Sequence, residues 1–164
     1  MRKYRIPALC IPALLCMLMI FLFSAQTAEV SSGTSGGLIE YALEKLSPSF
    51  DHLSPSEKKL CVDALQFIVR KGAHFSVYAL LGVLCSLPCS QLFSTIFRSA
   101  AAACAVSVLY AVTDELHQYF VPGRSCEVRD VLIDAAGACT GVLLFFLFRC
   151  ISATMKRKKR KRQC

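Results

Sequence analysis

The sequence predicts an all-α fold: an integral membrane bundle of four transmembrane helices with both termini on the cytoplasmic side. Of the 164 residues, 55% are hydrophobic and 18% are charged, whereas about a quarter of the residues in a soluble domain are charged. The apolar residues are concentrated in four long blocks, and basic clusters at residues 2–5 and 156–162 flank the first and the last block. Such clusters keep helix ends in the cytoplasm. Two cytoplasmic ends require an even number of crossings.

The first block, residues 6–23, is about long enough to cross a bilayer. A basic segment precedes it, so a signal peptide is the alternative. Phe23 and Gln26 stand where a cleavage site needs small residues, so we expect an uncleaved helix. In the following linker, the Ser/Gly/Thr-rich first half is typical of a loop, and "GLIEYALEKL" has the spacing of a short helix lying at the membrane interface.

The start of the second membrane helix is marked by the residues Ser54-Pro55-Ser56-Glu57. A Ser cap, a Pro at the first helical position and a Glu three residues after the cap together predict a capping box. The helix then continues into an almost wholly apolar part at residues 73–87. "PCSQ" at residues 88–91 predicts a tight turn.

The third block covers residues 93–120 and is ended by Pro122 and Gly123, and the fourth covers residues 127–153. The 120–127 turn then lies on the extracytoplasmic side. The chain divides into four parts: a basic flank and first helix at 1–23, an extracytoplasmic linker with the interfacial helix and the start of helix two at 24–72, a core of helices two to four at 73–153, and a basic cytoplasmic tail at 154–164.

Polar residues at the outer ends of the second, third and fourth helices share one side of the membrane. On the second helix they are spaced i, i+3, i+7, and on the third and fourth helices they are spaced i, i+4, so each set shares a helix face. Ionisable groups at membrane depth avoid lipid and face one another or water. The sequence therefore predicts an outward-facing polar pocket comprising Lys71, His74, Tyr78, Asp114, Glu115, Gln118, Arg124, Asp130 and Asp134.

Within this pocket we expect the carboxylates to pair with Lys71 and Arg124, with Arg129 as a further partner. Solvated headgroup contacts are the preferred interpretation for Arg129 and Glu127, which lie outermost. A network that only fixes helix register is the alternative for the whole set. We prefer a functional pocket for the groups that lie deeper in the apolar segments.

Other features of the sequence bound the function. Gly137 and Gly141 form a Gly-x-x-x-Gly pattern that predicts close packing of the fourth helix against a neighbour. No ligand spacing indicates a metal site, and we expect no cofactor. The basic clusters adjoin apolar blocks rather than a face with interleaved aromatic residues, so we expect no nucleic-acid partner. Most of the ten cysteines lie in apolar segments, but Cys61 and Cys126 share the outer side and could pair.

Four segments carry a resemblance to a known family. These are "FSAQ", "RKGAHFSVYALLG", "YAVTDELHQYFVPGR" and "RDVLIDAAGACTG", in this order along the chain. The ordered set resembles VanZ-like membrane proteins. The resemblance implies a four-helix, multi-pass protein of the bacterial plasma membrane, and it implies that the nine pocket residues are the characteristic polar residues of the family. The founding member of the family is associated with low-level resistance to the glycopeptide teicoplanin.

The resemblance and the pocket together lead us to expect an envelope or antibiotic-resistance accessory rather than an enzyme. Its partners would be membrane lipids, with an envelope lipid, an amphiphile or a glycopeptide-related ligand in the pocket. One alternative is a membrane-embedded enzyme on a phosphate- or sugar-bearing lipid, with His74 and Asp114 or Glu115 as acid and base and with Lys71 and Arg124 holding the headgroup. Another alternative is a small ion- or proton-coupled transporter that uses Asp134. The sequence leaves the oligomeric state open.

Overall fold

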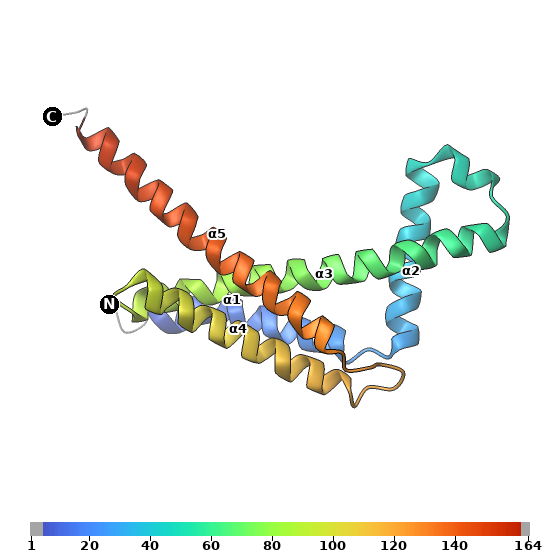
Figure 1. The fold of residues 1–164 in the computed structure, drawn as a ribbon, viewed down its shortest axis with the longest axis horizontal. Helices are drawn as coiled ribbons and strands as arrows, with labels where there is room; N and C mark the ends of the chain where they lie inside the picture. The colour runs from blue at the N-terminus through green and yellow to red at the C-terminus, as the bar shows by residue number, and fades with distance from the viewer. Residues whose placement is uncertain (1–4, 162–164) are drawn as a thin grey trace.

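The computed structural model describes residues 5–161, and this part of the chain is helical without strands. Four of the helices are long and apolar enough to cross a membrane, which confirms the predicted all-α fold with four membrane helices. Figure 1 shows these four packed together over part of their length, with the beginning of one of them and the remaining helices projecting past one end of the bundle. The elements are α1 (Arg5–Ser24), α2 (Ala28–Leu46), the short 3-10 helix η2 (Pro48–His52), α3 (Pro55–Leu92), α4 (Ile96–Gln118) and α5 (Val128–Lys161).

Helix α3 is the centre of the bundle, and it contacts α1, α2, α4 and α5. Its buried side chains include Tyr78 and Leu81, neither of which is exposed at all. Large apolar side chains such as Leu109 on α4 and Leu143 on α5 point outward and are exposed. An apolar exterior around a small-residue interior is the pattern expected of helices surrounded by lipid.

Glycines bring α5 into close contact with α3. A Cβ atom at Gly137 would overlap the carbonyl oxygen of Phe75, and one at Gly141 would overlap that of Ala79. Gly82 of α3 is packed in the same way against the backbone of α5. Helix backbones this close allow Cα–H···O contacts, which weakly stabilise helix pairs. The Gly-x-x-x-Gly stripe of α5 therefore lies against α3.

The predicted capping box at the start of α3 is confirmed. The Ser54 hydroxyl accepts a hydrogen bond from the Glu57 backbone N–H (3.4 Å), and the Glu57 carboxylate accepts one from the Ser54 backbone N–H (2.9 Å). Pro55 occupies the first turn, where its missing N–H leaves no intrahelical bond unmade. The beginning of the longest helix is thus fixed by local sequence.

The predicted turn at residues 88–91 is wrong. Helix α3 continues through Pro88 to Leu92, and the connection to α4 is formed by residues 93–95. Pro88 removes one backbone hydrogen bond, but it is buried on the same face as Cys85 and Cys89. Membrane helices tolerate proline where neighbouring helices cover it.

The loop predicted in the first half of the linker is also wrong. The Ser/Gly-rich stretch is the first half of α2, which is capped by Thr27. Gln66 of α3 donates hydrogen bonds to the Ser32 carbonyl (2.7 Å) and to the Ser35 hydroxyl (2.8 Å). These tertiary contacts offset the low helix propensity of Gly and Ser. At the other end of the chain, α5 runs to Lys161 instead of ending near residue 153.

We call α2, η2 and residues 55–70 of α3 the arm. In Figure 1 the arm projects beyond one end of the bundle, and α2 runs across α3 rather than along it. The α4–α5 connection lies at the same end, where Gly123 has a positive φ of 76° and the Ala28 N–H donates to the Pro122 carbonyl (3.4 Å). The beginning of α1, the α3–α4 connection and the end of α5 lie toward the opposite end.

Candidate functional site

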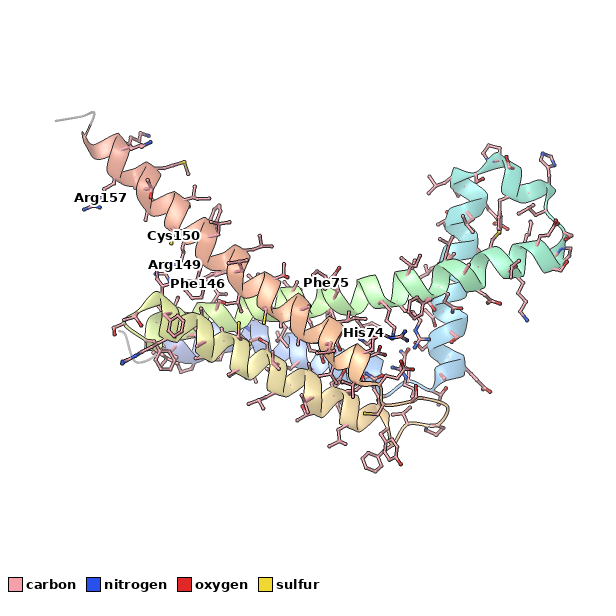
Figure 2. The ribbon with its side chains drawn as sticks, viewed as in Figure 1. His74, Phe75, Phe146, Arg149, Cys150 and Arg157 are labelled. Atoms are coloured by element: carbon pink, nitrogen blue, oxygen red, sulfur yellow. The ribbon has the colours of Figure 1, made fainter. Side chains whose placement is uncertain are left out.

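Two contacts between ionisable side chains join α3 to the beginning of α5. Lys71 forms an ion pair with Asp130, and Nδ1 of His74 lies 3.5 Å from Oδ1 of Asp134. Figure 2 shows His74 on α3 close to the start of α5, at the end of the bundle from which the arm projects. The i, i+3 spacing on α3 is therefore matched by an i, i+4 spacing on α5.

Asp114 of α4 is the polar centre of the contact with α3. Its Oδ2 atom accepts hydrogen bonds from the Tyr78 hydroxyl (3.1 Å) and from the Gln118 side-chain amide (3.2 Å). The Asp114 side chain is almost fully buried, with 4% of its surface exposed. Its other oxygen, Oδ1, is buried and has no hydrogen-bond partner.

Arg124 links the α4–α5 connection to the end of α1 by hydrogen bonds. Its guanidinium donates to the Gln118 side-chain oxygen (2.9 Å) and to the carbonyls of Gln26 (2.9 Å) and Phe23 (3.3 Å). The predicted pairing of Arg124 with the acids is wrong, because all three acceptors are neutral oxygens. Burial and the nearby charge of Arg70 lower the pKa of the Arg124 guanidinium.

Glu115 and Asp134 are two further buried carboxylates. Glu115 accepts a hydrogen bond from the Glu127 backbone N–H (2.9 Å), and its second oxygen has no partner. Asp134 is 1% exposed, and neither of its oxygens accepts a hydrogen bond. Arg129 is bonded to Glu127 (2.9 Å) at the surface, so it does not reach the buried acids. Each buried carboxylate carries a desolvation cost that its few contacts only partly offset.

A cavity of about 400 Å³ opens between α1, α2, α3 and α4 at this end of the bundle. His74, Tyr78, Asp114 and Arg124 of the predicted pocket border it. The other five predicted residues, Lys71, Glu115, Gln118, Asp130 and Asp134, do not border it. The full lining is Met19, Ile20, Phe23, Ser24, Gln26, Ser31, Thr34, Ser35, Leu38, Val69, Arg70, Ala73, His74, Val77, Tyr78, Asp114 and Arg124.

The sequence-based prediction missed Arg70 and the polar wall supplied by α2. Arg70 lies one helical turn before His74, so the i, i+4 rule places both on one face. Ser31, Thr34 and Ser35 have the same helical spacing, but this signal was lost because the stretch was assigned to a loop. Within residues 5–161 neither Arg70 nor Arg124 has a carboxylate within ion-pair distance.

His74 lies between a buried carboxylate and the cavity. Its Nδ1 faces Asp134, and the ring, which is 32% exposed, borders the cavity. A carboxylate behind an imidazole holds the orientation of the ring. This arrangement is suited to proton transfer with a molecule in the cavity.

The part of the chain that the structure describes contains neither a metal site of three or more side chains nor a disulfide between Cys61 and Cys126. No group of three or more His, Cys, Asp or Glu side chains there has the geometry to hold a metal ion. Cys61 and Cys126 are both free and exposed, so the pairing that the shared side allowed is not formed.

Comparison with models of known protein families identifies the family of this chain. A family model described as VanZ/LLP1 matches residues 9–149. No curated protein and no solved structure matches the chain significantly. The matched range covers most of the four membrane-spanning segments and contains every residue that lines the cavity.

Proposed function

Because this multi-pass membrane chain belongs to the VanZ/LLP1 family, we propose that it binds an amphiphile with an anionic headgroup in the cavity at the arm end of the bundle. The ligand is a membrane lipid or a related envelope molecule. The headgroup lies against Arg70 and Arg124, and its hydrocarbon chain lies against the apolar wall. The protein acts as an accessory that alters the envelope rather than as a soluble-substrate enzyme.

The observation that carries this proposal is the pair of guanidinium groups without carboxylate partners at one cavity. Unpaired charge in a low-dielectric site is costly, and a bound anion relieves that cost for both groups at once. Arginine also holds phosphate by two parallel hydrogen bonds. The guanidinium of Arg124 uses three N–H groups on neutral acceptors, and guanidinium has five.

The apolar part of the lining supports an amphiphile rather than a small inorganic anion. Met19, Ile20 and Phe23 of α1 line the cavity together with Val69 and Val77 of α3. A volume of about 400 Å³ is in the range of sites for small organic ligands, which are mostly apolar with a few polar groups. A headgroup and the first part of an acyl or prenyl chain fit this division.

The basic residues at both ends of the chain support an orientation with the cavity outward. Lysines and arginines are retained on the cytoplasmic side, and the arm carries both acids and bases. The cavity would then open to the outer leaflet of a bacterial plasma membrane. Through the family, we propose that the protein reduces susceptibility to teicoplanin by binding an envelope lipid or the glycopeptide itself.

Lipid affinity of single-charge variants tests the proposal. We expect Arg70→Gln to weaken binding of an anionic phospholipid by about tenfold, which corresponds to about 1.4 kcal/mol. Arg129→Gln is the matched control, because it removes one cation from the surface outside the cavity. Binding is measured by native mass spectrometry of the protein in detergent with added phosphatidylglycerol. Equal losses in both variants, or no bound lipid in the wild type, would contradict the proposal.

The His74–Asp134 arrangement favours a second candidate, hydrolysis of a phosphate ester in the bound lipid. His74 would take a proton from water while the water oxygen bonds to phosphorus, and it would return the proton to the leaving alcohol as the ester P–O bond breaks. Incubating the protein with phosphatidylglycerol and phosphatidic acid, and detecting diacylglycerol or free phosphate, tests this candidate. Product that forms with wild type and not with His74→Asn supports it. Absence of product with wild type contradicts it.

A further inference from the structure

We propose that the headgroup bound in the cavity carries a hydrogen-bond donor next to its phosphate, either a hydroxyl or an ammonium group, and that Asp114 accepts this hydrogen bond. The inference rests on the proposed function and specifies the class of ligand. An anionic group alone would satisfy Arg70 and Arg124 and leave Asp114 without its partner.

Asp114 has one satisfied and one unsatisfied oxygen. Oδ2 accepts from Tyr78 and from Gln118, while Oδ1 accepts from no group although the side chain is only 4% exposed. A buried acceptor without a partner costs about 1–3 kcal/mol, and more if it is charged. Because Asp114 borders the cavity, a molecule in the cavity is positioned to supply the missing donor.

Three neighbouring side chains of the cavity wall direct donors elsewhere. The Tyr78 hydroxyl donates to Oδ2, and Nδ1 of His74 faces Asp134. Arg124 directs three N–H groups to neutral oxygens rather than to Asp114. Within residues 5–161 no group donates to Oδ1, and we assign this acceptor to the ligand.

The hydrogen-bonded chain from Arg124 to Asp114 places the donor and the phosphate in one headgroup. Arg124 donates to the Gln118 oxygen, and the Gln118 amide donates to Asp114. One amide thus separates the guanidinium from the carboxylate. A phosphate at Arg124 and a donor at Asp114 are two adjoining parts of a phosphodiester headgroup, such as glycerol or ethanolamine phosphate.

Two pairs of lipids that differ in the donor alone test the inference on the wild-type protein. Phosphatidylglycerol and phosphatidylethanol have the same charge, and only the first has headgroup hydroxyls. Phosphatidylethanolamine and phosphatidylcholine are both zwitterionic, and only the first has N–H donors. We expect the donor-bearing member of at least one pair to bind about tenfold more tightly in nanodiscs, and the discriminated pair identifies hydroxyl or ammonium.

Asp114→Asn and Glu115→Gln complete the experiment. Asp114→Asn is expected to remove most of the discrimination, while Glu115→Gln, which changes a buried carboxylate that does not border the cavity, is expected to retain it. If phosphatidylethanol binds in an Arg70-dependent manner and neither pair is discriminated by the wild type, the donor inference is overturned and the proposed function stands. If none of the four lipids binds, the proposed function fails and the inference fails with it.

Discussion

Asp134 is an acid held inside the bundle with almost no compensation. It is 1% exposed, it accepts no hydrogen bond, and Nδ1 of His74 lies 3.5 Å from its Oδ1 atom. Replacing a solvated carboxylate by a buried one costs several kcal/mol unless a charge pair offsets it. A residue in this position lowers stability, which is typical of functional sites.

The first prediction follows from this cost. We expect Asp134→Asn to leave the thermal midpoint unchanged or to raise it, because the amide keeps the shape of the side chain and removes the buried charge. The measurement is thermal unfolding in detergent, with Asp63→Asn on the exposed face of the arm as control. A midpoint several degrees lower for Asp134→Asn than for Asp63→Asn would show instead that the pair with His74 stabilises the fold.

Lys71 and Asp130 form a different kind of pair, close to the surface. Their side chains are 22% and 20% exposed, so water still screens part of the attraction. We predict a coupling free energy of about 1 kcal/mol in a double-mutant cycle of Lys71→Met and Asp130→Asn, since the pair is partly buried. Unfolding in denaturant at low and high salt provides the measurement. Strictly additive single effects would contradict the prediction.

At the level of helices, the close contact between α3 and α5 depends on glycines, which carry a hydrogen atom where other residues carry a side chain. Gly141 and Gly137 lie against backbone carbonyls of α3. A backbone cannot move aside as a flexible side chain does, so added atoms must separate the helices. That separation would also part His74 from Asp134, because these residues lie on the same two helices.

We predict that Gly141→Ala lowers the free energy of unfolding by about 1–3 kcal/mol, the usual cost of overpacking. Gly37→Ala on α2 is the matched control, because nothing lies within 4 Å of its added Cβ. The control is expected to be stabilising by about 0.5–1 kcal/mol, since Ala is the better helix former. Both are measured by denaturant unfolding. A neutral or stabilising Gly141→Ala would contradict the close contact.

The helices that the sequence predicted well are those whose signals are local. Four apolar blocks located the membrane spans, and Ser54 with Glu57 located the beginning of α3 to the residue. The first half of α2 was missed because Gln66, far along the chain, supplies the hydrogen bonds that hold it. Pro88 was misread as a turn residue because its burial among neighbouring helices is a tertiary property.

For the whole molecule, the proposed orientation requires the cavity and the chain termini to lie on opposite sides of the membrane. Cys61 in the arm and Cys126 in the α4–α5 connection are exposed at the cavity end. Cys150, also exposed, lies toward the other end of α5, as Figure 2 shows. These three native thiols report on both faces of the membrane.

We predict that a membrane-impermeant maleimide labels Cys61 and Cys126 in intact cells, in variants that retain one of these thiols each. Cys150 is expected to react only after the membrane is permeabilised, because Arg149 and the basic helix end beside it favour the cytoplasm. Labelling is read by mass spectrometry, with permeabilised cells as the positive control. Reaction of Cys150 in intact cells would reverse the proposed orientation, and reaction of Cys61 without Cys126 would contradict the topology.

The candidate site was predictable in part, again for a physical reason. Helical spacing placed His74, Tyr78 and Asp114 at one depth, and these residues border the cavity. Spacing does not reveal which face of α3 meets α2, so Arg70 was left out. It also does not distinguish Arg124, which bonds neutral oxygens, from a partner of the acids.

The uninterrupted course of α3 has a mechanical consequence. Its 38 residues form one stiff rod about 57 Å long, which carries Arg70, His74 and Tyr78 at mid-length and the base of the arm at its far end. Turning this rod by a single residue step, about 100°, would withdraw all three side chains together. A ligand that holds Arg70 therefore also fixes the rotation of the beginning of the helix, 15 residues or about 22 Å away along its axis.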